Sequence, residues 1–116
     1  MSRKLEIRVG AAADALDRFE AAWNRVQEGR AMRPLEILSV ADLPLLLRTL
    51  SPARLSLLQA LRKHGPCSIY ELARRLARDY KNVHTDVTQL AAIGLIERRD
   101  AGVAVPWDLL QAELSL

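Results

Sequence analysis

A mainly helical α+β fold is predicted by three features of the sequence. Residues 51–94 carry apolar side chains at helical spacing, and capping and turn signals divide them into three helices. Residues 95–105 form two short β-prone runs around a turn. Short alternating runs also lie at residues 4–9, 35–39 and 110–116. With 116 residues, of which 50% are hydrophobic and 27% are charged, the chain suits one globular domain with a modest core.

Residues 1–50 are predicted to form a region that begins with a strand and a helix. Residues 4–9 alternate strictly, with Leu5, Ile7 and Val9 on one side, which is typical of a half-buried strand. From Ala11 to about Glu28 the apolar residues change to helical spacing. The region therefore starts with a strand followed by an amphipathic helix.

A second strand and a short helix are predicted to complete this region. Residues 35–40 are β-prone, and three of their side chains share one face: Leu35, Ile37 and Ser39. Residues 41–50 fit a short helix with Pro44 in its first turn, which proline tolerates there. Either Asp42 or Ser39 is expected to cap it.

Residues 51–106 are predicted to form a separate unit of three helices and a hairpin. Ser51 and Pro52 start the first helix as its N-cap and its first helical residue. Its buried side is expected to carry Leu55, Leu58 and Leu61. Ser68 and Glu71 have the spacing of a capping box at the start of the second helix.

The third helix of this unit is bounded by Asp79 as its N-cap and by Gly94 as a left-handed stop. Its apolar stripe consists of Val83, Val87, Leu90 and Ala91. Two short strands follow around residues 99–102, a loop whose composition suits a hairpin. Three short helices and a hairpin within about 55 residues describe a winged helix-turn-helix, in which the third helix enters the major groove of DNA.

The side of this helix opposite its apolar stripe carries the side chains expected to read DNA bases. They are Lys81, Asn82, Thr85, Thr88 and Gln89, with His84 on the flank. These are short or forked hydrogen-bonding groups. Asparagine and glutamine suit adenine, lysine suits guanine, and a threonine methyl group suits the methyl group of thymine.

Phosphate contacts are expected from side chains around the helix turn and on the hairpin. The candidates are Ser68, Arg74, Arg78, Arg98 and Arg99, together with Tyr80. Tyr80 and Tyr70 each have two interpretations, since either ring can pack under the turn or place its hydroxyl on a phosphate. Such contacts set affinity and orientation rather than sequence preference.

The basic residues are concentrated in the same unit. The net charge is +3, but Ser51 to Arg99 holds nine basic residues against four acidic ones, while the rest of the chain holds eight against ten. A basic segment beside a mildly acidic one favours a nucleic-acid-facing module joined to a protein-facing module. A solvated surface of mixed charge is the alternative.

Several motifs in this unit resemble a family of small prokaryotic winged-helix proteins that are MarR-like in class. The matching motifs are LSPARLxLLxALRxHGP, DYKNVHxDV, LxxIGLIER and VPWD, which span roughly half of the chain. The resemblance implies a transcriptional regulator, and some members look like antitoxins encoded beside a toxin. It gives the recognition role to Lys81, Asn82 and His84. Thr85 and Thr88 stand where many relatives are expected to carry a basic residue.

Enzyme and metal chemistry find little support in the sequence. Cys67 is the only cysteine, no cluster of cysteine and histidine has metal-ligand spacing, and no phosphate-binding glycine loop or nucleophile motif occurs. We therefore expect no catalytic residue, no metal and no cofactor. A signal peptide and a membrane span are not expected either, so the expected compartment is the cytoplasm.

A homodimer is the expected assembly. The three strand candidates are short, so a sheet at a dimer interface is plausible, with residues 107–116 forming a strand that packs on the N-terminal region. The side chains expected at that interface are Leu5, Ile7, Phe19, Trp23 and Leu114. A dimer would also place two recognition helices about 34 Å apart on a palindromic operator. A monomer that closes the sheet over its own core is the alternative.

The function that the sequence predicts is a sequence-specific regulator of transcription, a dimeric repressor that binds operator DNA. Regulation of its own operon is one form of this function. An antitoxin that binds operator DNA and also neutralises a toxin protein is one alternative. A winged-helix adaptor that binds another protein is the other.

Overall fold

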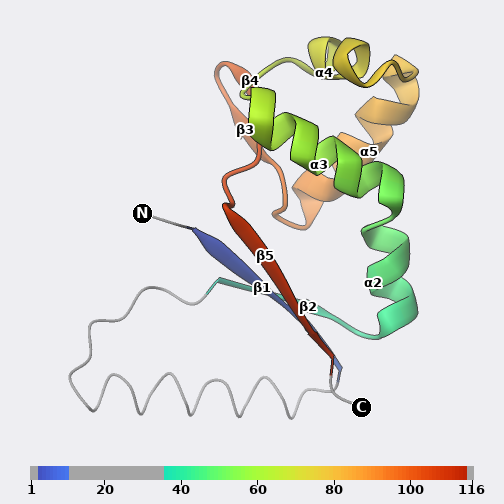
Figure 1. Cartoon of the computed structure of the whole chain (residues 1–116), viewed down its shortest axis with the longest axis vertical. Helices are drawn as coiled ribbons and strands as arrows, with labels where there is room; N and C mark the ends of the chain where they lie inside the picture. The colour runs from blue at the N-terminus through green and yellow to red at the C-terminus, as the bar shows by residue number, and fades with distance from the viewer. Residues whose placement is uncertain (1–2, 11–35, 115–116) are drawn as a thin grey trace, which may run out of the picture.

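Four helices and two small sheets make up the parts of the chain that the computed structural model describes, residues 3–10 and 36–114. The helices are α2 (Leu43–Thr49), α3 (Pro52–His64), α4 (Ile69–Leu76) and α5 (Tyr80–Ala92). The strands are β1 (Lys4–Val9), β2 (Glu36–Val40), β3 (Glu97–Arg99), β4 (Gly102–Ala104) and β5 (Leu109–Leu114). Roughly half of these residues are helical, and the predicted α+β class is confirmed (Figure 1). The helix predicted from Ala11 to about Glu28, with Phe19 and Trp23, lies outside the described residues.

The first strand is the centre of a three-stranded parallel sheet with the order β2-β1-β5. The predicted alternation is confirmed, because Leu5, Ile7 and Val9 are each no more than 5% exposed. The opposite face of β1 carries ion pairs, including Arg8 Nη2 with Glu6 Oε2 at 2.7 Å. Burial on one face and charge on the other fix the register of the strand, since a slip of one residue would exchange the two faces.

The second strand turns the face with Leu38 and Val40 to the core. Leu38 and Val40 lie opposite Ile7 and Val9 and share their buried side, whereas Ile37 is 36% exposed. The buried face of β2 is thus opposite to the face that carries Ile37 and Ser39. Leu35 lies outside the described residues. The register with β1 determines which face of β2 is buried, because β2 is too short for its own hydrophobic pattern to determine it.

The last strand brings the two ends of the chain into the same sheet. Leu110 of β5 lies opposite Leu5 of β1, and the two strands run parallel. The three-stranded sheet is therefore formed within one chain. Leu110 is half-buried, but Leu114 at the end of β5 is 43% exposed.

Local capping signals start the first two helices where the sequence predicts them. Asp42 caps α2 by accepting from Leu45 N at 2.9 Å, and Ser51 caps α3 by accepting from Arg54 N at 3.3 Å. The predicted buried stripe of α3 is partly wrong, because Leu55 is 40% exposed and Leu57 is completely buried. At about 100° per residue, Leu57 shares one arc with Leu58 and Leu61, and Leu55 falls outside it.

The next two helices are joined by a tight turn. Ser68 Oγ accepts from Glu71 N at 3.1 Å, which is the serine half of the predicted capping box. The backbone of Ala77 adopts a left-handed conformation with φ of 52° and ends α4. Asp79 then caps α5 by accepting from Asn82 N at 3.2 Å. The caps place the start of α5 directly beside the end of α4.

Two glycines shape the hairpin that follows α5. Gly94 has φ of +85° and closes the helix as predicted. The strands β3 and β4 are antiparallel, and Val103 of β4 also pairs with Cys67, through hydrogen bonds of 3.1 and 2.8 Å. Gly102 has φ of +126°, and a Cβ at this position would collide with the Cys67 carbonyl. This close approach ties the hairpin to the segment between α3 and α4.

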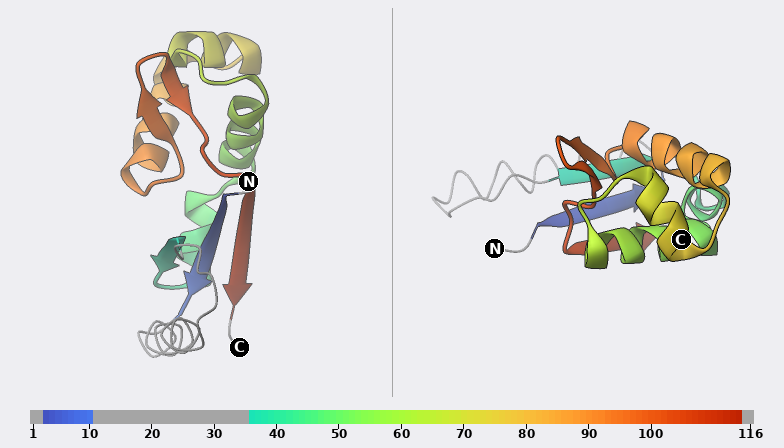
Figure 2. Two further views of the ribbon diagram at one scale, coloured as in Figure 1. Left: turned by 90° about the vertical axis from the view of Figure 1, so that its left-hand side faces the viewer. Right: turned by 90° about the horizontal axis from the view of Figure 1, so that it is seen from above.

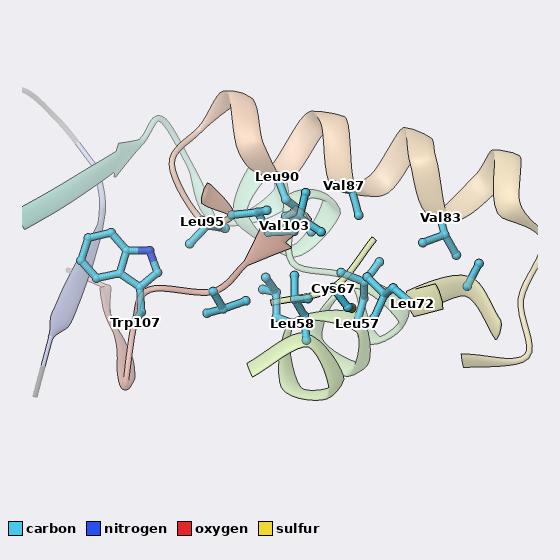
Figure 3. Close-up of a cluster of buried hydrophobic side chains, with 14 of the residues drawn as sticks. Leu57, Leu58, Cys67, Leu72, Val83, Val87, Leu90, Leu95, Val103 and Trp107 are labelled. Atoms are coloured by element: carbon cyan, nitrogen blue, oxygen red, sulfur yellow. The ribbon is translucent and has the colours of Figure 1, made fainter. Parts of the chain in front are cut away.

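A continuous hydrophobic core holds the helices, the hairpin and the sheet together. Figure 3 shows Val83, Val87 and Leu90 of α5 pointing toward Leu57 of α3 and Leu72 of α4, and these five side chains are completely buried. Burying each such side chain contributes about 1.5–3 kcal/mol relative to leaving it in water. A smaller cluster on the sheet joins this core through residues that contact both clusters: Leu38, Leu50 and Leu110.

Polar contacts around Trp107 join the helical unit to the sheet. Trp107 is buried, its Nε1 donates to the Gly94 carbonyl at 3.0 Å, and the Arg3 guanidinium lies 4.7 Å from its ring centroid. Asp108 accepts from Arg3 N at 2.7 Å and also pairs with Arg62 of α3. The backbone N–H of Arg3, with the Arg62 guanidinium, holds the pKa of the Asp108 carboxyl below its usual value.

Candidate nucleic-acid interface

The buried stripe of α5 determines which of its side chains face outward. Val83, Val87 and Leu90 pack against α3 and α4, so the opposite side of α5 points away from the core. The outward side carries Lys81, Thr85 and Thr88, all of which are exposed. Asn82, His84 and Gln89 on the flanks are exposed as well. The structure therefore brings together, on one helix, the polar set that the sequence singled out.

The hairpin lies on the same side of the molecule as this polar helix. Both views in Figure 2 place α5 and the β3–β4 hairpin on the side away from α3. Arg98 and Arg99 of β3 are exposed there. A single nucleic-acid duplex that contacts both α5 and the hairpin would therefore bind on the side away from α3.

An acidic residue inside the basic unit fixes the position of α5. Asp86 accepts from Arg54 Nε of α3 at 3.1 Å and from Arg78 Nη2 at 2.8 Å. The Asp86 side chain is 16% exposed, so water screens these contacts only in part. The pair with Arg54 joins α5 to α3, and the pair with Arg78 joins α5 to the turn before it.

This network changes the role of two candidates. Arg78 was predicted to contact phosphate, but its side chain is 29% exposed and bound to Asp86, and its Nη1 is buried without a hydrogen-bond partner. In this conformation Arg78 helps to orient α5, and a contact with phosphate would require its guanidinium to share or leave Asp86. Gln89 accepts from Arg54 Nη2, so its amide is oriented by α3 before any ligand arrives. Thr85 donates from its hydroxyl to the Lys81 carbonyl at 3.0 Å, which leaves its methyl group for contact with other groups.

Other basic candidates carry charge that the described part of the chain does not neutralise. Arg74, Lys81 and Arg98 are exposed, and none forms an ion pair with a carboxylate of residues 3–10 or 36–114. Arg99 pairs with Glu97 at 3.0 Å, but both side chains are more than 40% exposed. Such a surface pair contributes between 0 and about 1 kcal/mol, so Arg99 can exchange Glu97 for another anion at little cost.

The two tyrosines do not pack under the turn, which the sequence had left as one of two alternatives. Tyr70 is 63% exposed and Tyr80 is 49% exposed. Their ring centroids lie 6.5 Å apart, and the ring of His84 lies 5.9 Å from that of Tyr80. The remaining phosphate candidate, Ser68, is exposed but uses its hydroxyl oxygen to cap α4.

The pairing of Arg54 with Asp86 at this site was not expected from the sequence. Arg54 and Asp86 orient α5, but they lie 32 residues apart, and only the packing of α3 on α5 brings them together. Asp86 stands out in the sequence as one of four acids in the basic segment, and this was the available signal. The sequence left open whether the Tyr70 hydroxyl contacts phosphate, but the position of its ring beside Tyr80 depends on the packing of α4 against α5.

The predicted dimer contacts divide into buried and exposed side chains. Leu5 and Ile7 are 5% and 1% exposed and belong to the core of their own chain, so they offer no surface to a second copy in this conformation. Leu114 is 43% exposed and remains a candidate. Phe19 and Trp23 lie outside the described residues.

Neither a metal-binding cluster nor a membrane-spanning helix occurs in residues 3–10 and 36–114. No group of three or more histidine, cysteine, aspartate or glutamate side chains there has a geometry that could hold a metal ion. Cys67 is buried, and its burial raises the pKa of the thiol. None of the helices described for this chain has the length and apolar character needed to cross a bilayer.

Comparison with known proteins gives one match. A model of the HVO_A0114 family matches residues 49–112, which is more than half of the chain and includes α3, α4, α5 and the hairpin. No curated protein and no solved structure matches the chain. The match spans the whole exposed polar surface described above, and the chain belongs to the HVO_A0114 family.

Proposed function

We propose that this protein is a sequence-specific DNA-binding regulator of transcription, built as a winged helix-turn-helix and acting as a repressor. The observation that carries the proposal is the outward face of α5, where Lys81, Asn82, Thr85 and Thr88 are all exposed on a helix whose other side is completely buried. The order of the elements supports it, since three helices and a hairpin follow one another in the arrangement that such regulators use.

In this proposal α5 lies in the major groove and reads base edges. Lys81 donates to the O6 and N7 acceptors of guanine, and the Asn82 amide pairs with adenine. The methyl groups of Thr85 and Thr88 contact thymine. Because Arg54 and Asp86 hold α5 in place, the reading side chains start from an ordered helix and lose less entropy on binding.

Phosphate contacts would then come from Arg74 at the end of α4 and from the hairpin. Arg98 is the better hairpin candidate, because no described carboxylate pairs with it, and Arg99 first has to leave Glu97. Each lysine or arginine that neutralises a phosphate makes binding more dependent on salt, because a bound counterion is released. The MarR-like resemblance supports the same arrangement, with Lys81, Asn82 and His84 in the recognition role.

A homodimer on a palindromic operator completes the proposal. Within the described residues, β5 pairs only with β1, so its outer edge presents backbone groups that a second copy can pair with. Leu114 lies on this strand and is 43% exposed. An antiparallel pairing of two β5 edges would bury Leu114 and relate the two recognition helices by a twofold axis.

A protein-binding role is the second candidate, and two exposed leucines on one face of α2 favour it. Leu43 and Leu47 lie one turn apart and are 36% and 62% exposed. A regulator that also binds a toxin, or an adaptor that binds another protein, would cover these side chains. Co-expression with the product of an adjacent reading frame, followed by size-exclusion chromatography, tests this candidate, and failure to co-elute would contradict it.

The DNA-binding proposal is tested by titrating the protein into fluorescent duplexes. One duplex carries the DNA upstream of its own gene, and the other carries the same bases in shuffled order. We expect the upstream duplex to bind at least about 10³-fold more tightly, with an affinity that falls steeply between 50 and 200 mM salt. A weak affinity that is equal for both duplexes and insensitive to salt would contradict the proposal.

A further inference from the structure

Both tyrosines of the chain lie next to each other on the surface, with one of its two histidines beside them. Tyr70 projects from α4, and Tyr80 and His84 project from the first turns of α5. The ring centroids are 6.5 Å apart for the two tyrosines and 5.9 Å apart for Tyr80 and His84. The three rings therefore form one row across the junction of the two helices.

Core packing does not account for this row. The core beneath it is filled by Leu72 and Val83, both completely buried, whereas the two tyrosines remain 63% and 49% exposed. A tyrosine combines an apolar ring with a hydroxyl that donates one hydrogen bond, so it suits a surface that is covered only when a polar ligand arrives. The contacts between the rings restrict their movement before binding, which lowers the entropy lost on binding.

The charges around the row favour an anionic ligand. Arg74 lies one turn along α4, Lys81 directly follows Tyr80, and neither forms an ion pair with a described carboxylate. Two acids are also close in sequence, Glu71 and Asp79. One Asp79 oxygen already accepts a backbone N–H in the first turn of α5, which satisfies part of its charge locally. The row therefore borders cations that are available to a phosphate.

We propose that Tyr70, Tyr80 and His84 form a contact strip for the backbone of one DNA strand, in which the Tyr70 hydroxyl donates a hydrogen bond to a phosphate oxygen. This inference rests on the function proposed above and adds a contact from α4 that lies outside the groove-facing set of α5. Tyr80 holds the position of the Tyr70 ring and lies along the sugars, and His84 packs beside Tyr80 where the strip meets the groove-facing set of α5. Because a tyrosine hydroxyl is neutral, it adds affinity without changing the number of counterions released.

The test compares Tyr70→Phe and Tyr70→Ala with Leu47→Ala, a control of matched exposure on α2 at 62%. Affinity is measured by fluorescence anisotropy on the upstream and shuffled duplexes at four salt concentrations. Both Tyr70 variants are expected to weaken binding to both duplexes about threefold to tenfold, the equivalent of one hydrogen bond. The slope of log affinity against log salt is expected to stay unchanged, whereas Arg74→Ala, which removes a proposed phosphate contact, reduces its magnitude by about 1. Thermal midpoints should match wild type.

Three other results would each contradict a different claim: the phosphate contact of the Tyr70 hydroxyl, the contact strip, or the DNA-binding function. If Tyr70→Ala weakens binding but Tyr70→Phe does not, the ring rather than the hydroxyl makes the contact, and the phosphate assignment is wrong. If both variants bind like wild type, or if Leu47→Ala is equally weakened, the strip is wrong while the DNA-binding function stands. If the wild-type protein binds neither duplex, the proposed function fails and the strip fails with it.

Discussion

Arg54 of α3 donates from Nε to Asp86 Oδ1 of α5 at 3.1 Å, and this ion pair fixes the helix that carries the candidate reading face. The second Asp86 oxygen accepts from Arg78 at 2.8 Å, so one carboxylate connects two helices and the turn that precedes α5. With an exposed fraction of 16%, the Asp86 side chain is partly shielded from water. Removing one partner of this network therefore costs more than removing one partner of a surface ion pair, because it leaves a partly buried charge without a partner.

Asp86→Asn is expected to lower the free energy of unfolding by about 2 kcal/mol, because two guanidinium groups lose a partly buried partner. The amide keeps the shape of the side chain, so the effect reports charge rather than packing. Urea unfolding followed by circular dichroism measures it, with Asp100→Asn in the exposed hairpin loop as the control. Equal stability of the two variants would contradict the structural role of Asp86.

The two glycines around the hairpin are expected to respond differently to alanine. Gly102→Ala should cost about 3 kcal/mol or more, because it adds a collision with the Cys67 carbonyl to the strain of a φ of +126°. Gly94→Ala should cost only about 1–2 kcal/mol, since its φ is +85° but a Cβ there meets nothing within 4 Å. Thermal denaturation of both variants measures the difference, and equal losses would mean that the contact between Gly102 and Cys67 does not form.

The contact between Asp108 and Arg3 predicts a dependence of stability on pH. The folded state lowers the pKa of Asp108, chiefly through the Arg3 backbone N–H. A lowered pKa stabilises the fold above the ordinary aspartate pKa of about 3.9, and this stabilisation is lost as the pH falls through the lower folded value. Asp108→Asn should therefore have a lower melting temperature than wild type at pH 7 and approach it at acid pH. A constant difference across the pH range would contradict this linkage.

The edge of β5 predicts how two copies associate. Leu114→Lys places a charge on a side chain that is 43% exposed in one chain and would be buried by a second copy. We expect sedimentation equilibrium to show a dimer for wild type and a dissociation constant raised at least about tenfold for this variant, the effect of one buried charge without a partner. Leu55→Lys on α3, where the leucine is 40% exposed, is the control and should remain dimeric. A wild-type monomer at micromolar concentration would contradict the dimer.

Local chemistry made much of this fold predictable from the sequence. The caps at Ser51, Ser68 and Asp79 and the left-handed stop at Gly94 depend on residues at most four positions apart, and all of them occur where expected. The strict alternation of β1 also predicted its buried face. These signals are strong because they require no knowledge of what packs where.

Features that depend on distant parts of the chain were missed. The inner faces of β2 and α3 were set by their neighbours, which buried Leu38 and Leu57 and left Ile37 and Leu55 outside. The pairing of Arg78 with Asp86 was not expected, because the turn and α5 meet only after folding. At the candidate site, helical periodicity predicted the polar residues of α5. It could not predict which basic side chains are left without an ion pair after folding.

The most direct test of the DNA-binding function compares the dissociation constants of one lysine variant and one arginine variant for the upstream duplex. Lys81→Ala removes an exposed cation from the outward face of α5, and Arg48→Ala removes an exposed cation from α2. A regulator that reads DNA with α5 predicts that Lys81→Ala binds about tenfold or more weakly than wild type, the equivalent of 1–3 kcal/mol for a base contact, while Arg48→Ala binds nearly as well. Equal affinities for the two variants would show that α5 does not read the DNA.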